Sequence, residues 1–103
     1  MKQHRADPIP WDGDYSRFSR PLAHPGEHLR LDYLPEFKLD AQALSRALGL
    51  SDDSLVQMLL NEQLSVSLDL ASKLGVVFGT STEYWLNLQA SHDQSVVALK
   101  HRP

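Results

Sequence analysis

Histidines are the residues of this 103-residue chain best suited to hold a metal ion, and there are five of them. His24 and His28 are four residues apart, a spacing that can place two imidazoles on one face of a helix. Pro25-Gly26 lies between them, and proline favours the first turn of a helix, so His24 precedes that helix and the two rings should not share a face. The chain has no cysteine. We therefore expect no metal site, and no disulfide, from these residues or from His4, His92 and His101.

Serine, histidine and aspartate are all present, but not in a spacing that activates a nucleophile. A catalytic serine of the G-x-S-x-G type and a glycine-rich phosphate loop both leave recognisable patterns, and the chain contains neither. We expect no enzymatic activity, no cofactor and no small-molecule substrate.

The remaining chemistry is that of polar side chains which can contact DNA. The best candidates lie on a pair of expected helices joined by a glycine turn. Asp40 caps the first helix, in which Ala43-Leu44 and Ala47-Leu48 recur at helical spacing, and Gly49 ends it as a left-handed cap. A hydrophobic residue, Leu50, then anchors the turn before the next helix. This is the arrangement of a helix-turn-helix that lays its second helix in the major groove. The predicted DNA contacts are Gln42, Arg46, Ser54, Gln57 and Asn61.

Helical periodicity extends along most of the chain and indicates an all-α bundle of five short helices. The first helix opens at Pro25-Gly26 and should stop at Pro35. The helix-turn-helix pair follows, with its second helix starting at Ser51 or Asp52. A fourth helix is capped by Ser65 or Ser67 and ends at Gly79, and Thr80 or Ser81 caps a fifth that reaches about Ala90 or continues through Val96–Leu99. The inward residues expected of the fourth helix are Leu68, Ala71, Leu74 and Val77 or Phe78.

Four segments of this chain resemble one protein family. His24-Pro25-Gly26-Glu27 resembles an opening H-P-G-E, and Ser45–Ser51 resembles A-R-A-L-G-V-S. Leu60-Asn61-Glu62 resembles L-N-G or L-N-E, and Phe78–Gln89 resembles F-G-T-S-P-E-F-W-L-N-L-Q almost letter for letter. These segments are similar to those of the HigA (VapI) family of antitoxins, within the Xre-type, lambda-repressor-like helix-turn-helix class. The resemblance implies five helices, usually a homodimer, binding to operator DNA of a type II toxin–antitoxin operon, transcriptional autorepression, and neutralisation of a HigB toxin, an mRNA-cleaving protein of the RelE class.

The helix that should read the bases departs from the family pattern. Family members often carry basic or small polar residues on its first turns, whereas this chain has Asp52-Asp53. A carboxylate can accept from a cytosine amino group, but it repels phosphates, and both aspartates also suit a helix N-terminus. The stretch from Ser51 to Asn61 is one residue longer than usual. Either the turn is extended with Asp52 as the cap, or the helix gains a residue. Under the first option the outward residues of this helix are Asp53, Ser54, Gln57 and Met58. The inward residues are then Val56, Leu59 and Leu60.

Charge is distributed unevenly over the chain, whose net charge is −3. Residues 31–99 carry three basic side chains against nine acids, so the expected DNA-binding region is acidic as a whole. Basic residues of the N-terminal segment could add positive charge near DNA, as basic arms do elsewhere. They are Lys2, Arg5, Arg17 and Arg20.

Three regions follow from this pattern: an irregular N-terminal arm (1–23), a helix-turn-helix domain with a C-terminal dimerisation helix (24–99), and a short tail (100–103). The arm carries Trp11, Tyr15 and Phe18, which either cover exposed core or bind a partner such as the toxin. For the dimer interface we predict Tyr84, Leu88, His92 and Val96, whereas Trp85 and Leu86 should fill the core.

Two functions compete at this point. The first is a HigA-like repressor and antitoxin. The alternative is a divergent HigA-like protein-interaction module with weak or no DNA binding, which the acidic third helix favours. No apolar run approaches the roughly 20 residues of a membrane span, and the N-terminus lacks the apolar stretch of a signal peptide. We expect a soluble cytoplasmic protein under either function.

Overall fold

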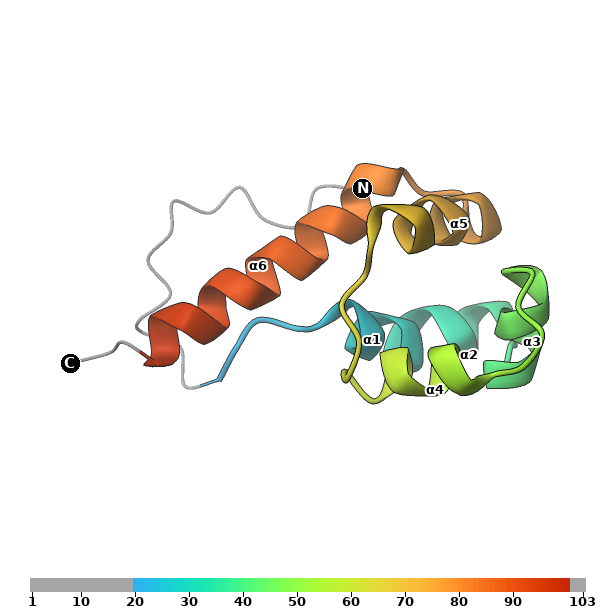
Figure 1. The fold of residues 1–103 in the computed structure, drawn as a ribbon, viewed down its shortest axis with the longest axis horizontal. Coiled ribbons are helices and arrows are strands. Elements are labelled where there is room, and N and C mark those ends of the chain that lie inside the picture. Colours follow the sequence, from blue (N-terminus) through green and yellow to red (C-terminus); the bar gives the residue numbers. More distant parts are fainter. Residues whose placement is uncertain (1–19, 101–103) are drawn as a thin grey trace.

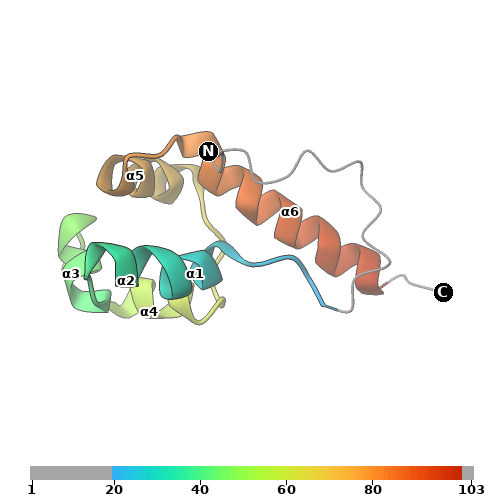
Figure 2. The same ribbon diagram turned by 180° about the vertical axis from the view of Figure 1, so that it is seen from behind.

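The computed structural model describes residues 20–100, which form five continuous helices and no strand. The first runs from Pro25 to Phe37 in three parts, α1 (Pro25–His28), a π-helical stretch (Leu29–Tyr33) and α2 (Leu34–Phe37). The others are α3 (Ala41–Ala47), α4 (Ser54–Leu60), α5 (Leu68–Phe78) and α6 (Thr82–Lys100). In Figure 1, α1 to α4 form one layer, α5 lies across from it, and α6 runs diagonally away toward the C-terminus. Figure 2 shows the same layers from behind.

The first helix continues past Pro35, so the expectation that it stops there was wrong. In a regular α-helix the proline ring collides with the carbonyl four residues earlier. Here a π-helical turn precedes the proline, and the Leu34 N–H donates to the Leu29 carbonyl, five residues back. The wider turn moves the backbone out of the α-helical register and accommodates the ring. The helix ends instead at Lys38, which takes a left-handed conformation with φ of 57°.

The core lies where all five helices meet. Trp85, Leu29 and Leu74 have no exposed surface, and neither do Leu44, Val56 and Leu59. The Trp85 indole Nε1–H donates to Thr80 Oγ1 at 2.7 Å, so the one polar atom of this ring is satisfied. The prediction that Trp85 fills the core is confirmed. α5 packs inward through Leu70, Ala71, Leu74 and Phe78, whereas Leu68 is 66% exposed and was wrongly expected inside.

Two glycines allow helices to approach more closely than any other residue would. A Cβ built on Gly26 would lie 1.9 Å from the Leu59 carbonyl oxygen, where α1 crosses α4. A Cβ on Gly75 would lie 2.7 Å from the Thr80 oxygen, where α5 meets the start of α6. The Pro25-Gly26 pair therefore serves packing as well as helix initiation.

Candidate nucleic-acid interface

α3 and α4 form the expected helix-turn-helix. Asp40 caps α3, and its Oδ1 accepts from the Ala43 N–H at 2.8 Å. Gly49 follows in the left-handed region, with φ of 80°, and lets the chain turn away. Leu48 is buried on one side of this glycine and Leu50 is half-buried on the other. The two leucines attach the turn to the core and hold α4 at the surface.

The turn before α4 is longer than the sequence suggested, because the helix begins at Ser54 rather than at Ser51 or Asp52. Asp52 Oδ1 accepts from the Ser54 N–H at 3.0 Å, an arrangement that closes the extended turn. Asp53 occupies the cap position without a side-chain bond to the backbone. Its Oδ2 instead accepts from Gln57 Nε2 at 3.3 Å. The additional residue therefore lengthens the turn, as in the first of the two options, but that option was wrong to make Asp52 the cap, because Asp53 occupies the cap position.

The five predicted DNA contacts are all exposed, and they lie on the surface of the helix-turn-helix. Gln42 and Arg46 project from α3, and Ser54 and Gln57 project from α4. Asn61 is the C-cap residue that follows α4. The buried side of α4 is formed by Val56, Leu59 and Leu60, as expected. Leu55 and Met58 remain 37% and 44% exposed, so the outer side of α4 carries apolar as well as polar groups.

A hollow of about 320 Å³ separates α3 from the turn. It brings Gln42 and Arg46 together with the two aspartates of the turn, whereas Ser54, Gln57 and Asn61 lie outside it. Arg46 is the only basic residue that lines the hollow, and it shares the hollow with two carboxylates. Residues 47–72 contain no lysine or arginine, so α4 and the following loop supply no positive charge.

One basic residue near α4 was missed by the sequence reasoning. Arg30, on the first helix, donates through Nη1 to the Leu60 carbonyl and pairs through Nη2 with Glu62 at 3.4 Å. Glu62 itself is left-handed, with φ of 62°. Arg30 therefore holds the end of α4 and adds a positive charge beside it. Its contacts lie 30 and 32 residues away in the sequence, and no local pattern indicates them.

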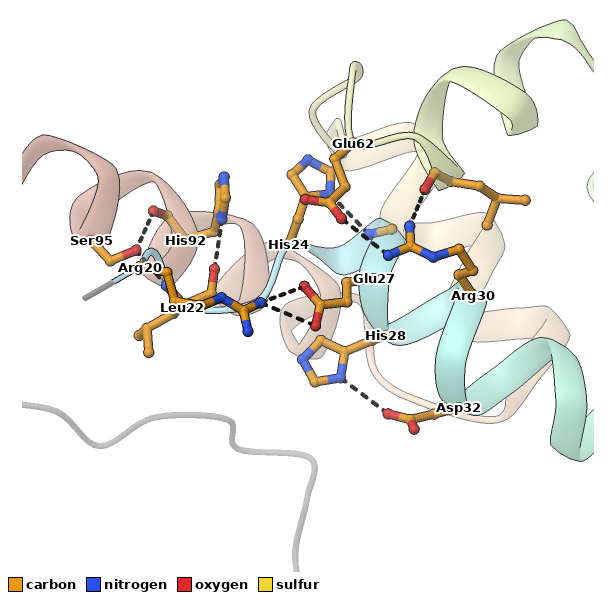
Figure 3. Close-up of polar contacts among 12 residues, drawn as sticks. Arg20, Leu22, His24, Glu27, His28, Arg30, Asp32, Glu62, His92 and Ser95 are labelled. Carbon is orange, nitrogen blue, oxygen red and sulfur yellow. Dashed lines mark hydrogen bonds and ion pairs between the residues drawn. The ribbon is translucent and has the colours of Figure 1, made fainter. Parts of the chain in front are cut away.

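A polar cluster fastens the start of the described chain to α6 (Figure 3). The Leu22 N–H donates to Ser95 Oγ at 2.8 Å, and the Leu22 carbonyl accepts from His92 Nδ1 at 2.7 Å. His92 also meets the His24 ring edge-on, at 4.9 Å between centroids. Arg20, one of the proposed basic arm residues, pairs with Glu27 at 3.2 Å. Trp11, Tyr15 and Phe18, like the other proposed arm cations Lys2, Arg5 and Arg17, lie outside the described residues.

His24 is the N-cap of α1, and its environment makes the neutral ring the favoured form. Nδ1 accepts from the Gly26 N–H at 2.9 Å, which requires that nitrogen to be unprotonated. Burial lowers the pKa of His24 below 6.5, and neighbouring His92 lowers it further, against the opposing effect of Glu62, Asp93 and a hydrogen bond with the Leu64 backbone.

Stability should consequently depend on pH through His24. Because the pKa in the folded state is lowered, the unfolded state takes up the proton first as pH falls below 6.5. The free energy of unfolding should have its full value above that pH and should decrease below it. His24→Asn keeps a cap acceptor but does not titrate, so urea midpoints between pH 5 and 7.5 should vary less with pH in this variant. An equally steep pH dependence in the variant would refute this role.

The four residues predicted for a dimer interface differ in how much surface they leave for a partner. Tyr84 and Leu88 are 4% and 5% exposed within a single chain. Tyr84 also hydrogen-bonds to the Tyr33 hydroxyl at 3.0 Å. This burial argues against their part in the predicted interface, because both side chains pack inside the protomer. His92 and Val96 are half-buried farther along α6.

The described part of the chain contains neither a cluster of metal ligands nor a membrane-spanning helix. Within residues 20–100, no three histidine or acidic side chains come close enough to hold a metal ion. His4 and His101 are outside that range. None of the described helices combines the length and the apolar character needed to cross a bilayer.

Several known proteins similar to this chain are antitoxins. The chain is 40% identical over 73 residues to virulence-associated protein I of Dichelobacter nodosus, covering 71% of this chain and 67% of that protein. It superposes on antitoxin GraA with a TM-score of 0.75 and 39% identity, covering 82% and 88% of the two chains. The chain belongs to the HigA (VapI) family of antitoxins. A structure of Pseudomonas aeruginosa antitoxin HigA with the higBA promoter superposes with a TM-score of 0.70 and 39% identity, covering 74% of this chain and 82% of that one.

Membership in the HigA family confirms the fold class expected from the sequence, an all-α Xre-type helix-turn-helix bundle of five helices. HigA antitoxins are not enzymes, in agreement with the chemistry of the sequence. No family model matches the chain.

Proposed function

We propose that this HigA-family chain is a dimeric antitoxin that binds operator DNA, represses its own operon in the cytoplasm, and neutralises a RelE/HigB-type mRNA-cleaving toxin. One observation carries the proposal. The surface helix α4 presents Ser54 and Gln57 outward, on a scaffold 39% identical to a HigA solved with promoter DNA.

In this proposal α4 enters the major groove and α3 lies across the phosphate backbone. Gln42 and Arg46 of α3 would contact phosphates, and Ser54 and Gln57 would contact base edges. Asn61, at the end of α4, would reach the backbone on the far side of the groove. Arg30 would add charge there, although its pairing with Glu62 offsets part of it.

A dimer would place two copies of α4 in successive major grooves, about 34 Å apart. The second half of α6 is the best candidate for the contact between copies. Val96 there is half-buried, and Val97 is 55% exposed. Light scattering of Val97→Glu against the natural chain tests this contact, because a carboxylate in an apolar interface should favour the monomer.

The toxin is the second proposed partner. RelE-class toxins are generally basic, so the acidic side of this chain could steer association with one. Asp52, Asp53 and Glu62 supply that charge. The proposed toxin contacts Trp11, Tyr15 and Phe18 stay a prediction.

Operator binding is tested by fluorescence anisotropy with the chain's own promoter and a random duplex of equal length, from 50 to 300 mM salt. The promoter should bind about 1,000-fold more tightly or better. Affinity should fall with salt as counterions are released, and Arg46→Ala should reduce the slope of log K against log salt by about one per protomer. Asp52→Asn should raise affinity for both duplexes, because it removes a charge that repels phosphate. Equal affinity for the two duplexes at low salt would refute the repressor role.

The alternative is a protein-interaction module with weak or no DNA binding. Asp52, Asp53 and the absence of basic residues from 47 to 72 favour it. Equal, weak binding to both duplexes, together with a stable complex with the co-expressed neighbouring toxin, would support this alternative.

A further inference from the structure

The amide of Gln57 has a defined orientation in this chain. Its Nε2 lies 3.3 Å from Asp53 Oδ2. An ionised carboxylate only accepts hydrogen bonds, so the amino end of the amide must face it. The carbonyl end, Oε1, and the second Nε2 hydrogen remain available. The exposed side chain of Gln57 therefore presents one acceptor and one donor side by side.

Adenine is the base whose major-groove edge matches this pair. It offers a donor at N6 and an acceptor at N7, which a glutamine can engage together. Guanine presents acceptors at both O6 and N7, so its O6 would face Oε1 and repel it. The side chains that usually select guanine are arginine and lysine, and α4 contains neither.

An apolar side chain on the outer side of the same helix can contact the partner base of the adenine. Met58 directly follows Gln57 on the exposed half of α4 and keeps 44% of its surface exposed. Leu55, two residues before Gln57, lies on the opposite flank of the helix. A thymine methyl group is the apolar feature of the major groove.

We infer that α4 selects A·T base pairs, with Gln57 bound to an adenine and Met58 against a thymine methyl group. Asp53 is a positioning residue that fixes the Gln57 amide and does not itself touch the base. The inference rests on the proposed operator binding and specifies which bases this helix reads.

In vitro selection from a random duplex library, with the full chain, tests the inference. The natural chain should recover a motif with adenine at one position of each half-site, preferred over guanine by about 5- to 150-fold. Gln57→Ala should lose the preference at that position alone. Asp53→Asn should bind DNA more tightly overall, because it removes a negative charge, yet discriminate less between adenine and guanine. Asp69→Asn on α5 is the charge-matched control and should keep full discrimination.

Modified bases then separate the two contacts. 7-Deaza-adenine, which lacks N7, should weaken binding of the natural chain but not of Gln57→Ala. Uracil in place of thymine, which lacks the methyl group, should weaken binding of the natural chain but not of Met58→Ala. If the adenine preference survives Gln57→Ala, the inference fails while operator binding stands. If the natural chain enriches no sequence, the proposed operator binding itself fails.

Discussion

Gly26→Ala should destabilise the protein by about 3 kcal/mol or more, because no space exists for a methyl group between α1 and α4. The added Cβ would lie 1.9 Å from the Leu59 carbonyl oxygen and 3.2 Å from His24 Nδ1. The atom it meets first is backbone, so the two helices would have to separate. The midpoint of urea unfolding, followed by circular dichroism at one fixed protein concentration, measures the loss.

Gly49→Ala is the matched control for this substitution. Gly49 is left-handed, but a Cβ there would meet nothing within 4 Å. The change should cost only the backbone strain of a left-handed alanine, about 1–2 kcal/mol. If Gly26→Ala unfolds at the same urea concentration as Gly49→Ala, the close approach of α1 and α4 is wrong.

Trp85→Ala should cost about 3–5 kcal/mol, a large part of the 5–15 kcal/mol that typically stabilises a small domain. The indole is fully buried, and its ring lies 5.1 Å from both Tyr33 and Tyr84 between centroids. Removing it leaves a cavity at the junction of the first helix and α6. For a domain of this size the melting temperature should fall by 10 °C or more, by an estimate of about 4–8 °C per kcal/mol.

Two further variants separate packing from hydrogen bonding at this site. Trp85→Phe keeps an aromatic ring but loses the bond to Thr80 Oγ1, so its effect should be smaller than that of alanine. Val76→Ala, at a side chain 85% exposed, should leave the melting temperature nearly unchanged. An unchanged melting temperature for Trp85→Ala would contradict the burial of the ring.

Local signals in the sequence predicted helices more reliably than they predicted where each helix begins and ends. Asp40 and Gly49 mark the two ends of α3 as expected, since capping depends on neighbours within a few residues. The continuation through Pro35 could not be foreseen, because it depends on a π-helical turn. The choice between Thr80 and Ser81 as the cap of α6 also needed the structure. Ser81 Oγ accepts from the Tyr84 N–H at 3.0 Å, whereas Thr80 is used by the buried indole.

The predicted inward positions failed where the helix pattern allowed more than one buried face. Ala47 is exposed and Ser45 is buried, although Ala47 belongs to the apolar pattern of α3 and Ser45 does not. The Ser45 hydroxyl donates to the Ala41 carbonyl, which satisfies it inside the bundle. Leu68 points outward because it is the first residue of α5, where the helix has not yet reached the core.

The candidate DNA contacts were found from the sequence as a set of residue types at helical spacing, and all five are exposed. Their relation to one another required the tertiary structure. The hollow joins Gln42 and Arg46 to the aspartates of the turn, and Arg30 reaches α4 from a different helix. Neither relation has a sequence signal, because each joins residues that only packing brings together.

The sequence by itself determined the all-α class, the helix-turn-helix and the family, because helix periodicity, caps and the motif at Phe78–Gln89 are local patterns. The tertiary structure alone decided which side chains are buried and which remain exposed for a partner or for DNA. It buries Tyr84 and Leu88 inside one chain, fastens Leu22 to α6, and joins Arg30 to the end of α4. The physical reason is that burial and side-chain orientation depend on neighbours from other helices and turns, whereas helix formation depends mainly on neighbours along the chain.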